Sequence, residues 1–354
     1  MLQLTMNQVI PHLRMHIPRP LPDSSMYTPS FPMGPLRAKG GNTNKVVVVM
    51  GATGTGKSKL AIDLARRLGG EVVNSDKMQV YDGLDVVTNK VTKEECMGVP
   101  HHLINGVHPD ADFTASDFRT HATRAVDSIT ERGLLPIIAG GSNSYIEELV
   151  DGANGQFRSR YKCCFIWVDV QLSVLHDFVS ERVDRMIERG LVEEVRALFD
   201  PNADYSKGLR RAIGVPELDA YLRSEGILEE SERRIQLTNA IDEIKANTCK
   251  LTCCQLDKIR RLASLPGWTV NRIDATEVFR KRGDVAEEAW ESAVAGPSVR
   301  AVRRFLLGEK EALSSEEVCS NFAKVMEKGI VMAGAGKVPV LSPRKGLSVA
   351  GATI

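Results

Sequence analysis

A glycine-rich loop between a predicted strand and a predicted helix constrains the fold of this chain more than any other feature. The segment 51–58 reads GATGTGKS, follows five apolar residues at 46–50 and opens a helical pattern at 57–68. Its spacing, G-x-x-x-x-G-K-[ST], brings backbone N–H groups and a helix N-terminus together around phosphate. The loop therefore predicts an α/β domain that binds a phosphorylated ligand.

Strand-like and helical segments alternate over the first half of the chain. Such alternation is typical of a parallel sheet flanked by helices, so we expect a P-loop NTPase-like α/β fold with its ligand crevice at the carboxyl ends of the strands. The predicted strands are 46–50, 71–74, 134–139 and 165–170, and the predicted helices are 57–68 and 115–132. A mainly helical half follows, with helices expected at 172–189, 193–199, 216–223 and 229–265.

The two ends of the chain differ in composition from its centre. Residues 1–43 hold four basic residues and one acidic residue among prolines and serines, which indicates a transit peptide or a leader without a fold. We expect one domain at 44–306, whose helical part is about 172–265. A flexible tail with one helix-like part at 315–327 is expected at 307–354.

Composition argues against several classes of protein. The net charge of +1 gives no electrostatic evidence for a long nucleic-acid footprint. The sequence lacks a run of 18 uncharged apolar residues, so we expect no membrane span. The seven cysteines form no repeated C-x-x-C framework, which favours reduced structural thiols over a zinc site built on Cys249 and Cys253.

Polar residues in and after the loop have the types that phosphate chemistry requires. Lys57 should neutralise terminal phosphate oxygens, and Ser58 should help to hold Mg²⁺. Asp76 follows the second predicted strand, where a carboxylate could act as general base on an acceptor, or could instead cap the next helix. Gln79 and Tyr81 follow closely and could hydrogen-bond or stack on a flat ring.

The loop alone leaves the reaction open. Most proteins that contain it hydrolyse a nucleoside triphosphate or transfer its terminal phosphoryl group, with a strand-end aspartate that holds Mg²⁺. Asp169 is a candidate for that aspartate, and Arg182 and Arg185 have the spacing of arginines that close over phosphates. A small-molecule kinase is therefore one alternative, although a surface ion-pair role would equally explain the two arginines.

Seven segments together resemble the isopentenyltransferase family, and within it the plant adenylate isopentenyltransferases that make cytokinins. They run in order from about residue 45 to residue 306. The segments are GATGTGKS, SDKMQVYDGLDVVTNK, GVPHHLI, FTASDFR, LPIIAGGSNSYIEEL, GLRRAIGVPEL and DATEVF.

The resemblance implies a prenyltransferase that moves the dimethylallyl group of dimethylallyl diphosphate to N6 of a free adenine nucleotide, the first step of cytokinin synthesis. Diphosphate leaves, stabilised by Lys57 and Mg²⁺. Asp76 matches the family's general base, and Thr55 matches a third catalytic position. The other positions that match diphosphate- or nucleotide-binding residues are Gly51, Ala52, Thr53, Gly54, Gly56, Ser58, Gln79, Ser142 and Arg211.

Two features favour a free nucleotide over tRNA as the acceptor. The resemblance implies that tRNA-modifying members carry a long helical insertion after the glycine-rich third motif, which grips the anticodon stem. Here only 19 residues, 146–164, separate GGSNSY from the next predicted strand, which is too short for such a domain. The tail also lacks the Cys/His finger of the larger eukaryotic tRNA enzymes of the family. The resemblance implies ATP or ADP rather than AMP, with Arg210 and Arg211 at the crevice rim and Arg211 the nearer. It also implies dimethylallyl diphosphate rather than its hydroxylated relative.

We further expect a monomer located in the plastid, with mitochondrion and cytosol as alternative locations. One position departs from the family pattern, because TCCQL has Cys254 where ACRQL would have arginine. If that arginine contacts a phosphate in the family, the change removes a charge-assisted contact of about 1.5–3 kcal/mol, for which Lys250 could substitute. A nucleotide-binding paralogue with impaired catalysis is therefore the second alternative.

Overall fold

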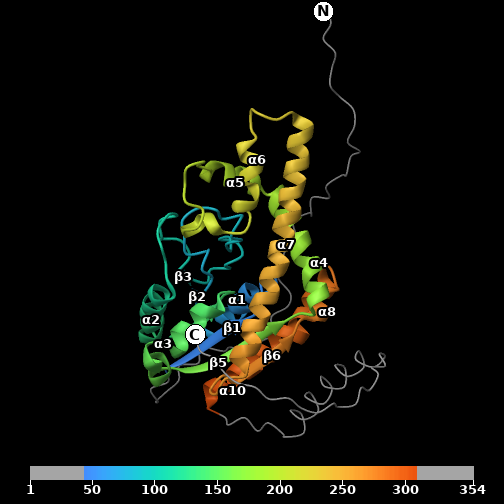
Figure 1. Cartoon of the computed structure of the whole chain (residues 1–354). Helices are drawn as coiled ribbons and strands as arrows, with labels where there is room; N and C mark the ends of the chain where they lie inside the picture. The colour runs from blue at the N-terminus through green and yellow to red at the C-terminus, as the bar shows by residue number, and fades with distance from the viewer. Residues whose placement is uncertain (1–43, 309–354) are drawn as a thin grey trace, which may run out of the picture. The chain divides into compact units, whose positions relative to one another are not determined.

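The computed structural model describes residues 44–308 (Figure 1). The leader expected at 1–43 lies outside the described residues, and so does the tail expected at 307–354, with its helix at 315–327, apart from its first two residues. Within residues 44–308, none of the helices combines the length and the apolar character needed to cross a membrane.

A six-stranded sheet forms the centre of the described part, with the order β3-β2-β4-β1-β5-β6 and parallel pairing throughout. At its middle, Val48 pairs with both Ile138 and Phe165. Continuous apolar runs such as 46–50 are expected here because helices bury a parallel sheet on both faces. The strands are β1 (Lys45–Met50), β2 (Gly70–Asn74), β3 (His101–His102), β4 (Leu135–Ala139), β5 (Lys162–Asp169) and β6 (Val270–Asp274).

The predicted P-loop α/β fold is confirmed, and so is the helical half. The helices are α1 (Lys57–Leu68), α2 (Ala115–Glu131), α3 (Asn143–Arg160), α4 (Leu172–Glu188), α5 (Leu191–Leu198), α6 (Asp219–Arg223), α7 (Glu230–Ala263), α8 (Thr276–Phe279), α9 (Asp284–Trp290) and α10 (Gly296–Leu307). Short 3₁₀ turns, η1 (Gly208–Arg211) and η2 (Pro216–Leu218), and a π-helical turn, η3 (Glu291–Ala295), complete them. Sequence reasoning missed α3, β3, β6 and the helices after β6.

Two hydrophobic clusters organise these elements. The larger one joins the sheet to the helices on its faces, and the smaller one packs the segment 80–87 against α4–α6. The long helix α7 belongs to both clusters, since Ile244 lies in the smaller one and Ile259 in the larger one. Figure 1 shows α7 running from the helical part down to the sheet. One face of α7 therefore lies over the carboxyl ends of the strands.

Candidate active site

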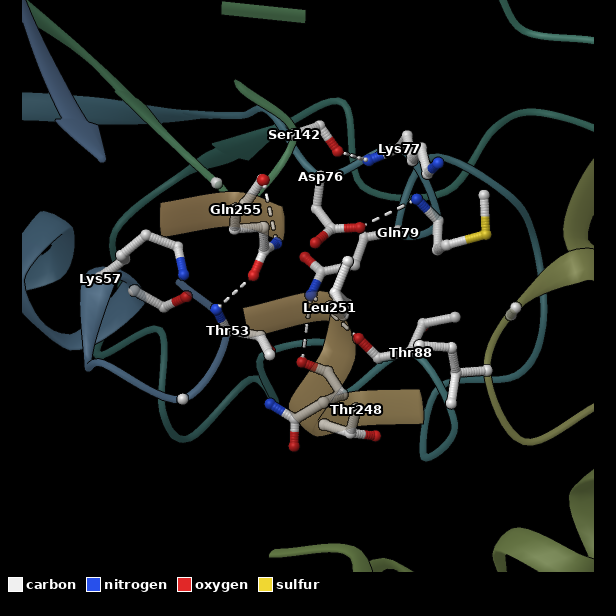
Figure 2. Close-up of a pocket in the computed structure, with 18 of the residues that line it drawn as sticks. Thr53, Lys57, Asp76, Lys77, Gln79, Thr88, Ser142, Thr248, Leu251 and Gln255 are labelled. Atoms are coloured by element: carbon white, nitrogen blue, oxygen red, sulfur yellow. Dashed lines mark hydrogen bonds between the residues drawn. The ribbon is translucent and has the colours of Figure 1, made fainter. Parts of the chain in front are cut away.

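A cavity of about 490 Å³ lies between the phosphate loop, the carboxyl ends of β2 and β4, and the helices α4 and α7 (Figure 2). This is where ligands bind in open parallel sheets, because the loops that follow adjacent strands meet there. Its charged and polar lining includes Thr53, Lys57, Ser58, Asp76, Lys77, Gln79, Ser142, Arg182, Arg211, Gln255 and Lys258.

The phosphate loop is a tight turn that needs glycine at its end. Gly56, which precedes α1, has a φ of 88°, and a Cβ there would lie 2.8 Å from the ring of Trp290. The Lys57 ammonium donates a hydrogen bond of 2.6 Å to the Ala52 carbonyl. The loop is thus folded around its own lysine, with Trp290 packed behind it.

Two cations, Lys57 and Arg182, line the cavity beside the phosphate loop. Lys57 is buried and Arg182 is partly buried. Burial lowers the pKa of Lys57 to about 8, with the Asp76 carboxylate opposing the shift and Arg182 adding to it. Burial likewise lowers the pKa of Arg182 to about 10. Arg182 donates to the Thr53 hydroxyl at 2.9 Å, while its Nε has no hydrogen-bond partner among the described residues. A bound anion would therefore offset the free-energy cost of desolvating both cations.

Asp76 stands just beyond β2 and is held in place by its neighbours. Its N–H donates to the Asn74 side chain at 3.1 Å, and its Oδ1 accepts the Met78 N–H at 2.9 Å. The other oxygen faces Gly141, where a Cβ would lie 3.7 Å away. Turns rather than a helix follow β2 directly, so Asp76 holds a turn and is not a helix cap. Its carboxylate lines the cavity that contains Lys57.

Other predicted site residues divide into those that line the cavity and those behind it. Ser58 and Gln79 line it, and the Gln79 amide donates to the carbonyl of Thr88 at 3.0 Å. Ser142 also lines it and accepts the Lys77 N–H at 2.9 Å. Thr55 is fully buried and donates to the Ala52 carbonyl at 3.0 Å. The lining does not include Gly51, Ala52 or Thr55, so the catalytic role of Thr55 stays a prediction.

The two neighbouring arginines have different environments. Arg211 is exposed and lines the cavity, as expected of the nearer residue. Arg210 is only 9% exposed and donates to Asp110 at 2.9 Å and to the Leu198 carbonyl at 2.7 Å. Lys77 and Lys258 also line the cavity, and the pKa of Lys77 is lowered by burial and by the charges of Arg211 and Lys258. The rim of the cavity is therefore cationic.

Two of the three residues that suggested a kinase, Asp169 and Arg185, form ion pairs away from the cavity. Asp169 is 8% exposed, forms an ion pair of 2.5 Å with Arg272 and does not line the cavity. Arg185 pairs with Glu181 at 3.6 Å, so only Arg182 of the arginine pair reaches the cavity. The kinase alternative thus lacks its metal-binding aspartate.

Sequence reasoning missed the contribution of α7. Ile244, Thr248, Leu251, Gln255 and Lys258 follow helical spacing and all line the cavity. The signal was available in Thr248 and Gln255, which are polar residues that alternate with the apolar Ile244 and Leu251 at helical spacing.

Cys254 also lines the cavity and is exposed. The residue expected to compensate for it, Lys250, does not line the cavity, whereas Lys258 does. The lysine of α7 that lines the cavity thus lies one turn after Cys254 rather than one turn before it.

Comparisons with known proteins agree with this arrangement. Residues 79–160 and 152–261 match the family model described as IPP transferase. Adenylate isopentenyltransferase 5, chloroplastic, of Arabidopsis thaliana is 61% identical over 74% of this chain and 80% of its own length. Adenylate isopentenyltransferase 7, mitochondrial, of the same plant is 54% identical over 74% of this chain and 80% of its own length. An adenylate isopentenyltransferase of Humulus lupulus is 44% identical over 73% of this chain and 89% of its own length.

Solved structures of tRNA enzymes share the fold. A full-length tRNA isopentenylpyrophosphate transferase from Bacillus halodurans has a TM-score of 0.60 and 27% identity, over 76% of this chain and 100% of that chain. A eukaryotic dimethylallyltransferase acting on tRNA has a TM-score of 0.61 at 22% identity, over 76% and 82%. The sheet and the helical half described above are therefore a shared architecture.

Proposed function

Because the chain belongs to the isopentenyltransferase family, we propose that it is an adenylate isopentenyltransferase, which transfers a dimethylallyl group from dimethylallyl diphosphate to N6 of ATP or ADP. One observation carries the proposal. A single cavity contains a carboxylate, Asp76, and two desolvated cations, Lys57 and Arg182. A general base for the acceptor amine and cations that bind the donor diphosphate thus lie in one site.

The donor side of the cavity supplies electrostatic stabilisation. Lys57, Arg182 and the N–H groups of the phosphate loop would hold the diphosphate, whose negative charge grows as the bond between C1 and oxygen breaks. Both cations are poorly solvated in the free protein, so they need little reorganisation when the charge develops. This arrangement makes the allylic C1 electrophilic.

The acceptor side supplies the base. The N6 amine attacks C1, a C–N bond forms, and the proton lost from N6 passes to the Asp76 carboxylate. One Asp76 oxygen is fixed by the Met78 N–H, which orients the other oxygen. The products are the N6-dimethylallyl nucleotide and diphosphate.

An apolar wall favours the unhydroxylated donor. Val87, Val183, Met186, Ile213 and Ile244 line the cavity. A dimethylallyl tail gains from contact with these side chains, whereas a terminal hydroxyl buried among them would lose its hydrogen bonds to water. We therefore expect dimethylallyl diphosphate to be preferred over its hydroxylated relative.

Mg²⁺ fits the donor set that the cavity offers. The Ser58 side chain lines the cavity, and residues 44–308 hold no cluster of three or more carboxylate, imidazole or thiol groups suited to a metal. Mg²⁺ commonly takes few protein ligands and completes its shell with water and substrate phosphates, so a hydroxyl plus a diphosphate is suitable. When bound there, the ion would neutralise charge on the leaving diphosphate.

The acceptor proposed here is a free nucleotide and not tRNA. The support is the identity of 61% to an adenylate enzyme against 27% to a tRNA enzyme. Lys77, Arg211 and Lys258 at the rim suit the additional phosphates of ADP or ATP over AMP. We propose a monomer as the acting form.

The plastid is the location that the relatives support. Several carry the word chloroplastic in their names and one the word mitochondrial. A fluorescent fusion of residues 1–44 tests this directly. Accumulation in plastids is expected, and a signal that stays diffuse in the cytosol would count against import.

A double-label assay tests the reaction. We expect label from dimethylallyl diphosphate to appear on ATP or ADP with release of diphosphate. Formation of ADP from ATP together with a phosphorylated acceptor would support the kinase instead. Binding of both substrates without turnover would support the impaired paralogue.

A further inference from the structure

We propose that Gln255 is a positioning residue that sets the separation between the phosphate loop and the general base. The inference rests on the proposed function, because it concerns how the donor and the base of that reaction are held relative to each other. Gln255 comes from α7, far from both groups in the sequence, and lies between Lys57 and Asp76 in the cavity wall (Figure 2).

Both ends of the Gln255 amide are used. Its Oε1 accepts the N–H of Thr53 in the phosphate loop at 2.7 Å, and its Nε2 donates to the Gly141 carbonyl at 3.0 Å. Its own backbone carbonyl accepts from the Asn143 side chain at 3.2 Å. Gln255 is 7% exposed, so water cannot easily replace these bonds if they are lost.

The Gly141 end of this bridge is tied to the base. The turn after β4 packs so closely on Ser75 that a Cβ at Gly140 would lie 2.3 Å from the Ser75 carbonyl carbon. The Ser142 N–H donates to the Ser75 carbonyl at 3.2 Å, and the Ser142 hydroxyl accepts the Lys77 N–H at 2.9 Å. Residues 75 and 77 flank Asp76, so the position of the turn fixes the position of the carboxylate.

The Thr53 end of the bridge is tied to the donor site. Arg182 donates to the Thr53 hydroxyl at 2.9 Å, while Gln255 accepts the Thr53 N–H. Thr53 is thus held between a cation that faces the cavity and a neutral amide. A neutral group is required at 255, because a carboxylate there would repel the diphosphate that Lys57 and Arg182 attract.

The consequence is a rigid connection from Thr53 through Gln255 and Gly141 to Asp76. The Gln255 amide accepts an N–H through its oxygen and donates to a carbonyl through its nitrogen, and it remains uncharged at neutral pH. Without the bridge, the loop and the turn would each keep their fold but could move relative to one another. Displacement of a reacting group by about 1 Å can cost about 10²-fold in rate.

The test compares Gln255→Met with Gln236→Met in the full-length chain. Both glutamines lie on α7, but Gln236 is outside the cavity lining and its Oε1 has no hydrogen-bond partner among the described residues. We expect Gln255→Met to lower kcat about 10–100-fold. Equilibrium binding of ATP should stay close to that of Gln236→Met, which should behave as the wild type. The thermal midpoint of Gln255→Met should fall by about 3–12 °C, because the Thr53 N–H and the Gly141 carbonyl lose buried bonds.

Gln255→Glu supplies a second readout. It keeps the acceptor for Thr53 but loses the donor to Gly141 and adds negative charge, so KM for dimethylallyl diphosphate should rise above that of Gln255→Met. The inference is overturned if Gln255→Met keeps wild-type kcat, or if its loss is matched by Gln236→Met. It is also overturned if the equilibrium affinity for ATP falls in proportion to kcat, since that marks a general structural role. Absence of prenyl transfer by the wild type would instead reject the proposed function.

Discussion

Lys57 and Asp76 line one cavity, and their opposite charges interact across it. Burial lowers the pKa of Lys57 to about 8, while the Asp76 carboxylate opposes that shift. The lysine is therefore close to losing its proton in the free protein at mildly alkaline pH. This interaction links the lysine proposed to bind the donor diphosphate to the proposed general base, and kinetic measurements can test both residues.

The first prediction concerns pH. Lys57 is charged below its pKa of about 8 and neutral above it, so the free protein should lose affinity for dimethylallyl diphosphate as the pH rises through that value. With both substrates below their KM, kcat/KM for the donor should fall by up to about tenfold per pH unit above pH 8. Lys57→Ala should be weak in both rate and donor binding and should lack this descending limb. A wild-type profile that stays flat to pH 10 would contradict the assignment.

The second prediction separates the paired arginines. Arg211→Ala removes an exposed cation from the rim, so KM for ATP should rise about tenfold, with a smaller rise for AMP and an unchanged thermal midpoint. Arg210→Ala removes the buried bonds to Asp110 and the Leu198 carbonyl. It should lower the thermal midpoint by about 3–12 °C while leaving the preference for ATP over AMP intact. The reverse pattern, in which Arg210→Ala changes the preference for ATP over AMP and Arg211→Ala does not, would contradict the placement of Arg211 at the nucleotide phosphates.

The fold was easier to predict than the site, for a physical reason. The strand β1, the phosphate loop and α1 are encoded by neighbouring residues, and α1 has the predicted bounds of 57–68. In contrast, α3 is interrupted by four non-helical residues at 152–155, and β3 has only two residues. Such irregular elements owe their form to packing and give little periodic signal.

The same distinction applies to the candidate site. Lys57 ends the loop after β1 and Asp76 lies just beyond β2, so their positions at the crevice could be predicted from topology. Gln255 bonds to groups 202 and 114 residues away, and no local pattern reports such contacts. Arg182 could be proposed from spacing alone, but only the structure distinguishes it from Arg185, which points to Glu181 instead.

The third prediction concerns the departure at Cys254. This exposed thiol lines the cavity on α7, one turn before Lys258. Cys254→Arg adds a cation to a site for phosphorylated ligands, and a charge-assisted bond of about 1.5–3 kcal/mol corresponds to a fall of about 10–100-fold in KM for one substrate. Cys254→Ser should leave KM for both substrates unchanged. If Cys254→Arg binds both substrates no better, the departure has no cost in affinity.

The most direct test of the account is the turnover of Asp76→Asn. Asparagine keeps the shape and the acceptor for the Met78 N–H but cannot take a proton from the N6 amine. We predict that kcat for dimethylallyl transfer to ATP falls about 10²–10⁴-fold, while the equilibrium affinity for ATP changes little. Turnover of Asp76→Asn close to that of the wild type would contradict the account, because Asp76 would then only hold its turn and the reaction would lack its base.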